Sequence, residues 1–158
     1  MVSILRYGMV GGGEGAFIGD VHRKAAAFDR LAAITAGCFS RDAAKSATTG
    51  QKLGISSDRI YTNYEEMAEE EAKREDGIHF VSIVTPNSSH YNIAKTFLTR
   101  GIHVVCDKPL TVEESEAREL ERIAKERGLL FCVTYTYSGY PMVKQAREMV
   151  RNGKLGDI

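Results

Sequence analysis

Short apolar runs alternate along the chain with longer segments of helical periodicity. Runs rich in valine, isoleucine, leucine and alanine occur at 4–10, 31–39, 78–84, 102–106 and 129–133, and each has the length of a strand. The run at 78–84 is almost continuously apolar, which is typical of a strand buried on both faces. The pattern predicts buried strands separated by helices.

Capping and turn residues mark the predicted helices. Asn63 and Thr111 are each followed three residues later by a glutamate, the spacing of a capping box. Ser88 or Ser89 can cap a helix that ends at Gly101, where a left-handed glycine is favoured. Helices are predicted from the loop after the first strand to about residue 28, over 42–53, from 63 onward, from 88 or 89 to 101, from 111 to 128 and over 140–151. The acidic run at 69–71 indicates a solvated helix face rather than a metal site.

The order of these elements predicts the class of fold. Strands that alternate with helices imply right-handed βαβ crossovers and a parallel sheet covered on both faces. We therefore expect a doubly wound α/β protein with three α/β/α layers. The 158 residues suit one domain. The segment 152–158 resembles a turn leading into a further strand, so residues 1–158 are expected to be one domain of a longer chain.

Composition excludes some classes of protein. The 21 basic and 21 acidic residues balance, which argues against a nucleic-acid partner. No apolar run approaches the roughly 20 residues needed to span a bilayer, and no signal peptide is apparent. The cysteines, Cys38, Cys106 and Cys132, form no C-x-x-C pair, so we predict core positions, no metal site and a reducing cytoplasmic location.

A glycine-rich loop follows the first predicted strand. Five of the nine residues from Gly11 to Gly19 are glycines. Glycines let a pyrophosphate approach the backbone closely, and the next helix offers unpaired N–H groups and the positive end of its dipole. Two registers are open: Gly11, Gly13 and Ala16 match G-x-G-x-x-A, whereas Gly11, Gly13 and Gly19 match a loop three residues longer. The strand–loop–helix context predicts a Rossmann-type dinucleotide site.

The end of the second predicted strand bears on the choice of dinucleotide. In such folds, the residue about 20 positions past the last loop glycine contacts the adenosine ribose. Ser40 and Arg41 stand there, where an acidic residue would favour NAD. Arg41 can pair with the 2′-phosphate of NADP, or it can simply face water, and the adjacent Asp42 could serve the NAD pattern. The expected cofactor is NADP or NAD, with NADP slightly favoured.

Two further motifs follow predicted strands. T-P-N at 85–87 closes the strand 78–84 and is followed by His90, and D-K-P at 107–109 closes the strand 102–106. With the glycine loop and G-x-x-H at 19–22, they resemble the Gfo/Idh/MocA family, which takes in glucose–fructose oxidoreductase, inositol dehydrogenase and many sugar dehydrogenases. The resemblance runs from about residue 4 to 158.

This resemblance implies roles for individual residues. Residues 85–87 would line the nicotinamide–ribose end of the site. Lys108 would contact both that ribose and a substrate hydroxyl, which makes it the candidate catalytic residue. Asp107 replaces the glutamate of the family's E-K-P motif, and Pro109 would fix the backbone so that the lysine points inward. A lysine directly after a buried strand is also expected to be poorly solvated, which suits proton transfer.

Two tyrosines and two histidines each have two possible roles. Tyr137 and Tyr140 lie where the family often carries an arginine that is absent here, and they either touch substrate or pack. His22 and His90 either serve the site or cap and pack a helix start. The candidate cofactor-binding residues are Gly11, Gly13, Gly15, Ala16, Gly19, Ser40, Arg41, Thr85, Pro86, Asn87, His90, Asp107, Lys108 and Pro109, and the candidate substrate-binding residues are Lys108, Tyr137 and Tyr140.

The expected function is hydride transfer to or from a carbon of a sugar, polyol or cyclitol. The family resemblance places an aspartate, a histidine and an oligomerisation sheet in a C-terminal domain, so the fragment is expected to be inactive alone and the full-length protein to be a homo-oligomer. A dinucleotide-sensing regulator of the same fold has no use for Lys108. A methyltransferase using S-adenosylmethionine would not explain the motif at 85–87.

Overall fold

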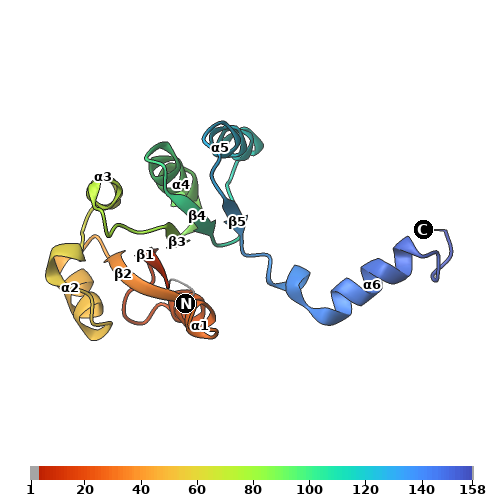
Figure 1. The fold of residues 1–158 in the computed structure, drawn as a ribbon, viewed down its shortest axis with the longest axis horizontal. Helices are drawn as coiled ribbons and strands as arrows, with labels where there is room; N and C mark the ends of the chain where they lie inside the picture. Colours follow the sequence, from red (N-terminus) through yellow and green to blue (C-terminus); the bar gives the residue numbers. More distant parts are fainter. Residues whose placement is uncertain (1–3, 158) are drawn as a thin grey trace.

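Residues 4–157 are described by a computed structural model, in which five parallel strands form one sheet (Figure 1). The order across the sheet is β2-β1-β3-β4-β5. The strands are β1 (Leu5–Gly11), β2 (Ala32–Cys38), β3 (Phe80–Val84), β4 (His103–Cys106) and β5 (Phe131–Val133). Because the chain moves outward from β1 in one direction and from β3 in the other, the predicted doubly wound sheet is confirmed.

Helices cover the two faces of this sheet. Figure 1 shows α3, α4 and α5 together on one side and α1 on the other, which confirms the three-layer arrangement. The helices are α1 (Phe17–Ala27), α2 (Ala43–Lys52), α3 (Tyr64–Lys73), α4 (His90–Thr99), α5 (Glu114–Glu126) and α6 (Pro141–Arg151), with short 3₁₀ turns η1 (Ser57–Arg59), η2 (Asn87–Ser89) and η3 (Thr136–Gly139). None of the helices in the described range is long and apolar enough to cross a membrane.

The core lies on both faces of the central strands. On the side of α4, Val81 and Ile83 belong to one buried cluster with Phe97. On the side of α1, Tyr7 and Met9 belong to a second cluster, and the Tyr7 ring stacks on Phe80 with centroids 5.2 Å apart. Burial on both faces is the property that the apolar strand runs predict.

Buried polar contacts fix the chain beyond β2. Ile60 forms an isolated parallel bridge with Gly37, which extends the sheet past β2. Arg59 and Glu71 make a buried ion pair, with Arg59 Nε donating to Glu71 Oε1 at 2.9 Å, and the hydroxyl of Tyr61 donates to the same oxygen at 3.1 Å. A buried charge needs such partners to offset its desolvation, so this cluster holds the segment at 59–61 in one place.

Two helix starts differ from their predicted form. The capping box of α5 joins Glu113 and Glu116, two residues after the predicted one, while Thr111 Oγ1 donates to Glu113 O at 2.9 Å. Ser89 precedes α4 without a side-chain capping bond, because its hydroxyl turns back toward residues 85 and 86. Asn63 caps α3 as predicted, accepting from two backbone N–H groups.

The region after β4 leaves part of one sheet face open. Cys38 and Cys106 are buried as predicted, but Cys132 is exposed, so its predicted core position is wrong. Phe131 packs against the core cluster on the α4–α5 side, and the alternation of a strand turns Cys132 to the opposite side. Figure 1 shows α6 extending away from the sheet, and no α6 residue is buried.

The end of the chain forms the turn predicted there. Within the described residues, 152–155 form turns and 156–157 have no regular structure, while Ile158 lies outside the described residues. Helix α6 matches the helix predicted over 140–151.

Candidate functional site

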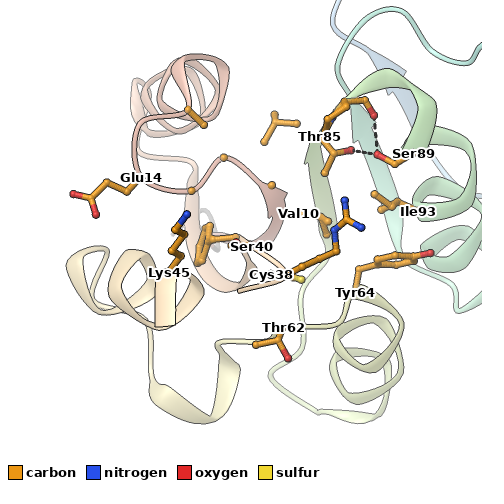
Figure 2. A pocket seen from close by; sticks show the side chains of 18 residues that line it. Val10, Glu14, Cys38, Ser40, Lys45, Thr62, Tyr64, Thr85, Ser89 and Ile93 are labelled. Atoms are coloured by element: carbon orange, nitrogen blue, oxygen red, sulfur yellow. Dashed lines mark hydrogen bonds between the residues drawn. The ribbon is translucent and has the colours of Figure 1, made fainter. Parts of the chain in front are cut away.

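A cleft of about 700 Å³ lies where β1, β2 and β3 end. The connections leave β1 and β3 toward opposite edges of the sheet, so this is the switch point at which open parallel sheets bind ligands. The volume is within the range of roughly 300–1,000 Å³ found for small-molecule and cofactor sites. Figure 2 shows the cleft between the β1 loop, the corner after β2 and the end of β3.

The glycine loop forms one wall of this cleft. Gly11 and Gly12 have φ values of +85° and +69°, a region in which a side chain is strained. A Cβ on Gly13 would lie 2.9 Å from the carbonyl oxygen of Phe39, so the loop runs directly against the end of β2. The bare backbone of Gly11 and Gly13 therefore borders the cleft.

Helix α1 begins at the same wall. Its N-cap, Ala16, lines the cleft and provides no side-chain capping bond, so the first N–H groups of the helix have no cap from that side chain. Glu14, the one acidic residue of the lining, forms an ion pair with Lys52. Gly15 and Gly19 stand outside the lining: Gly15 is exposed, and Gly19 is buried against Gly12.

The corner between β2 and α2 carries two positive side chains. Ser40, Arg41 and Lys45 all line the cleft, and Figure 2 shows Ser40 and Lys45 on the side opposite Thr85. Asp42 does not line it. Its carboxylate instead caps α2, accepting from the backbone N–H of Lys45 at 3.1 Å, and its own N–H donates to Ser40 Oγ at 3.1 Å. The corner therefore presents cations to the cleft.

Several residues of this cleft carry no signal in the sequence. Thr62 and Tyr64 line it from the segment after Ile60, and Lys45 lines it from α2. The buried Ser46 supports this wall: the Phe39 N–H donates to Ser46 Oγ at 3.2 Å, and Ser46 Oγ donates to the carbonyl of Tyr61 at 2.7 Å. The bridge beyond β2 is too short to leave an apolar run in the sequence, so no pattern marked this segment.

The end of β3 forms the opposite wall. Thr85 and Pro86 line the cleft, as does Ser89, which no sequence motif assigned to it. Ser89 Oγ lies 2.8 Å from Thr85 Oγ1 and 2.7 Å from the carbonyl of Pro86 (Figure 2), which fixes the turn after the strand. Asn87 is exposed and lies outside the lining.

Asp107 lies on the other face of the sheet, toward α1. Thr134 Oγ1 donates to Asp107 Oδ1 at 2.9 Å, and His22 Nε2 lies 3.8 Å from the same oxygen. His22 Nδ1 is 2.9 Å from Ser82 Oγ. Burial lowers the pKa of His22, and the carboxylate of Asp107 opposes that shift. These contacts lie within the protein, and the contact with the cofactor that the resemblance implied for Asp107 stays a prediction.

Lys108 and Pro109 follow directly and are both exposed. The expectation that Lys108 is poorly solvated is therefore wrong for this chain, because the loop carries it out past the end of β4. His90 is buried, and its ring nitrogens face the carbonyl oxygens of Thr85 and Pro109. It does not line the cleft, and it packs at the start of α4.

Tyr137 and Tyr140 lie in and after η3, away from the cleft lining. Their rings pack edge to face with centroids 5.4 Å apart, and Tyr137 is 75% exposed. The two side chains contact each other, and both present surface to solvent.

The cleft brings together part of the predicted site. The predicted residues that line it are Gly11, Gly13, Ala16, Ser40, Arg41, Thr85 and Pro86. The predicted residues outside its lining are Gly15, Gly19, Asn87, His90, Asp107, Lys108, Pro109, Tyr137 and Tyr140. A bare glycine backbone, an uncapped helix start and two nearby cations suit a phosphate-bearing ligand. No group of three or more potential metal ligands gathers anywhere in residues 4–157.

The fold and the cleft together define a nucleotide-binding α/β domain of the Rossmann type. The family described as "Oxidoreductase family, NAD-binding Rossmann fold" (GFO_IDH_MocA) matches residues 5–135. The chain therefore belongs to the Gfo/Idh/MocA family of oxidoreductases, which confirms the resemblance drawn from its motifs.

Individual relatives cover nearly all of this chain. The uncharacterized oxidoreductase YfiI of Bacillus subtilis (strain 168) is 45% identical over 155 residues, which are 98% of this chain and 39% of that protein. The crystal structure of an inositol dehydrogenase homolog from Azotobacter vinelandii complexed with NAD+ is 41% identical, with a TM-score of 0.96 over 100% of this chain and 41% of that one. A second structure of that homolog holds NADH and myo-inositol, with a TM-score of 0.96 over 42% of its chain. The chain thus spans about two fifths of the length of these relatives.

Proposed function

We propose that this chain is the dinucleotide-binding part of an NAD(P)-dependent oxidoreductase that acts on a carbon of a sugar, polyol or cyclitol. The observation that carries the proposal is the cleft at the switch point, bordered by the bare glycine loop and by the uncapped start of α1. When bound, the nicotinamide cofactor supplies or accepts the hydride.

Different residues of the cleft would contact different parts of the dinucleotide. Gly11, Gly13 and the start of α1 would hold the pyrophosphate through backbone N–H groups. Thr85 and Pro86 would contact the ribose at the nicotinamide end. Ser89 holds Thr85 for that contact through the 2.8 Å hydrogen bond between their hydroxyl oxygens.

Lys108 is the proposed catalytic residue. It follows β4, the strand next to β3, so it stands beside the end of the cleft that carries Thr85. Its exposed side chain is free to meet a substrate hydroxyl, where the amino group would hold or move the hydroxyl proton. Asp107, Pro109 and His90 would act through the loop that bears the lysine.

The proposed cofactor preference is for NADP(H). Arg41 and Lys45 line the cleft at the corner after β2, and Asp42, which could have served NAD, caps α2 instead. A 2′-phosphate would meet two positive side chains there. The solved homolog from Azotobacter vinelandii binds NAD+ and NADH, so the preference is a property we propose for this chain and not for its relatives.

The proposed class of substrate draws on the names of relatives. These include a levoglucosan dehydrogenase of Pseudarthrobacter phenanthrenivorans and the homolog solved with myo-inositol. The chain spans about two fifths of these relatives or less. We therefore propose that segments beyond this part position the substrate and support assembly into a homo-oligomer. The 158-residue chain would then bind cofactor without turning over substrate.

Replacement of Lys108 tests the proposal. In the full-length polypeptide that contains this chain, Lys108→Ala should lower kcat about a hundredfold or more, the usual scale for loss of a general acid or base. Dinucleotide affinity should largely survive. Lys125→Ala, in an exposed ion pair on α5, is the matched control. Full activity of Lys108→Ala would overturn the catalytic assignment.

A further inference from the structure

His90 connects two loops that the sheet itself leaves apart. It is the first residue of α4, and only 1% of its surface is exposed. Its Nδ1 lies 2.8 Å from the carbonyl oxygen of Pro109, and its Nε2 lies 2.8 Å from the carbonyl oxygen of Thr85. One carbonyl belongs to the wall of the cleft, and the other belongs to the residue after Lys108.

The backbone offers no equivalent link. The last pair in the register between β3 and β4 is Ile83 with Cys106, and the last backbone hydrogen bond there runs from the Asp107 N–H to the Ile83 carbonyl at 2.9 Å. Past that point, within residues 4–157, no hydrogen bond runs directly between 84–89 and 108–112. The two segments are linked only by the contacts that each makes with the ring of His90. The relative position of the two loops therefore depends on this side chain.

The ring lies between two hydrogen-bond acceptors. A carbonyl oxygen can only accept, so a ring nitrogen that carries a proton donates to the carbonyl that it faces. Both ring nitrogens lie 2.8 Å from their carbonyl oxygens, which is a hydrogen-bond distance. The ring is therefore held between the two loops.

We propose that His90 is a positioning residue whose buried ring, held between the carbonyls of Pro109 and Thr85, sets the loop of Lys108 against the wall of the cleft formed by Thr85. The inference rests on the proposed function of Lys108, and it adds the means by which the lysine is placed. His90 touches neither cofactor nor substrate in this scheme.

The ring protons give a readout that does not depend on activity. In the 158-residue chain with ¹⁵N-labelled histidine, a long-range ¹H–¹⁵N spectrum should show a His90 ring N–H whose proton exchanges slowly with water, as a buried hydrogen bond to a carbonyl requires. The signals are assigned by their loss in His90→Gln. A His90 ring proton that exchanges as fast as that of a free histidine would overturn the contact, and this measurement on the parent chain does not require the variant to be active.

Kinetics of the full-length polypeptide then separate positioning from stability. His90→Gln keeps an amide donor for one carbonyl and should lower kcat by about tenfold to a hundredfold, the scale of a misplacement near 1 Å, with the Kd for dinucleotide close to that of the parent. Thr99→Ala, which removes a hydrogen bond at the far end of the same helix, should leave kcat unchanged.

A double-mutant cycle measures whether His90 acts through Lys108. If His90 acts through Lys108, then His90→Gln should have little further effect on kcat in the Lys108→Ala background. Additive losses, or an unchanged kcat in His90→Gln, would overturn the positioning role while leaving the function of Lys108 in place. Full activity of Lys108→Ala alone would instead overturn the proposed function and the positioning role with it.

Discussion

A Cβ built on Gly19 in α1 would lie 2.4 Å from the Cα of Gly12 in the glycine loop. The neighbouring atom is backbone, so it cannot rotate away as a flexible side chain could. This contact sets the distance between α1 and the end of β1, and it therefore decides where the first N–H groups of α1 stand relative to the cleft.

Gly19→Ala should destabilise the fold. In an ordinary helical position this change is favourable by about 0.5–1 kcal/mol, but forcing an atom into close packing costs about 1–3 kcal/mol. We expect the free energy of unfolding, measured by urea denaturation, to fall. Gly139→Ala is the matched control, because a Cβ there would meet no atom within 4 Å. Equal stability of Gly19→Ala and the parent would show that the loop adjusts freely.

Arg41→Ala should reduce affinity for NADPH far more than affinity for NADH. A hydrogen bond to a charged partner contributes about 1.5–3 kcal/mol, or roughly tenfold to a hundredfold in affinity. Lys45→Ala should shift the ratio in the same direction. Lys73→Ala, in an exposed ion pair on α3 outside the cleft lining, is the control. Equal affinities of the parent chain for both dinucleotides, measured by fluorescence titration, would contradict the preference.

Stability should fall as the pH is lowered through the range in which unfolded histidine titrates. The folded protein lowers the pKa of His22 because the ring is buried. The unfolded chain therefore takes up a proton first, near its ordinary pKa of about 6.5, and this uptake favours unfolding. The contribution is fully present above that value and declines below it, toward the folded pKa.

His22→Gln isolates this contribution. The free energy of unfolding, measured by urea denaturation at about pH 7.5 and about pH 5.5, should decline less in the variant than in the parent. The variant should also lose some stability at the higher pH, because the contact with Ser82 at 2.9 Å is disturbed. The same decline in both proteins would show that His22 does not contribute to it.

One thiol should react with alkylating reagents in the folded protein. Burial raises the pKa of Cys38 to about 11 and that of Cys106 to about 12, so both thiols stay protonated near neutral pH. Cys132 is exposed. A thiol assay should find one fast-reacting group per chain, absent in Cys132→Ser, and three groups after unfolding. Rapid labelling of Cys38 in the native protein would mean that the cleft wall opens.

Local patterns predicted the fold because each strand and helix is marked by its own residues. The apolar runs ending near Val10 and Val84 mark two strands, and Asn63 marks the start of α3. The glycine loop and the corner at Ser40 were also found, because their spacing reflects the geometry of a single strand–loop–helix unit.

Side-chain directions could not be predicted in the same way. Asp107 turns toward His22 on one face of the sheet, although adjacent motif residues suggested a shared role with Lys108. Ser46 supports the cleft through hydrogen bonds to Phe39 and Tyr61, which lie seven and fifteen residues away. These roles depend on contacts between distant segments, and no local pattern records them.

Binding of a nicotinamide dinucleotide in the cleft is tested most directly by replacing Gly13. A valine there would push against the Phe39 carbonyl, 2.9 Å from its Cβ position, and would occupy the surface that we assign to the pyrophosphate. Fluorescence titration of the 158-residue chain with NADPH and NADH should show saturable binding in the parent and in Gly139→Ala, and none in a folded Gly13→Val variant. Unchanged affinity of Gly13→Val, or no binding of either dinucleotide by the parent, would contradict the account.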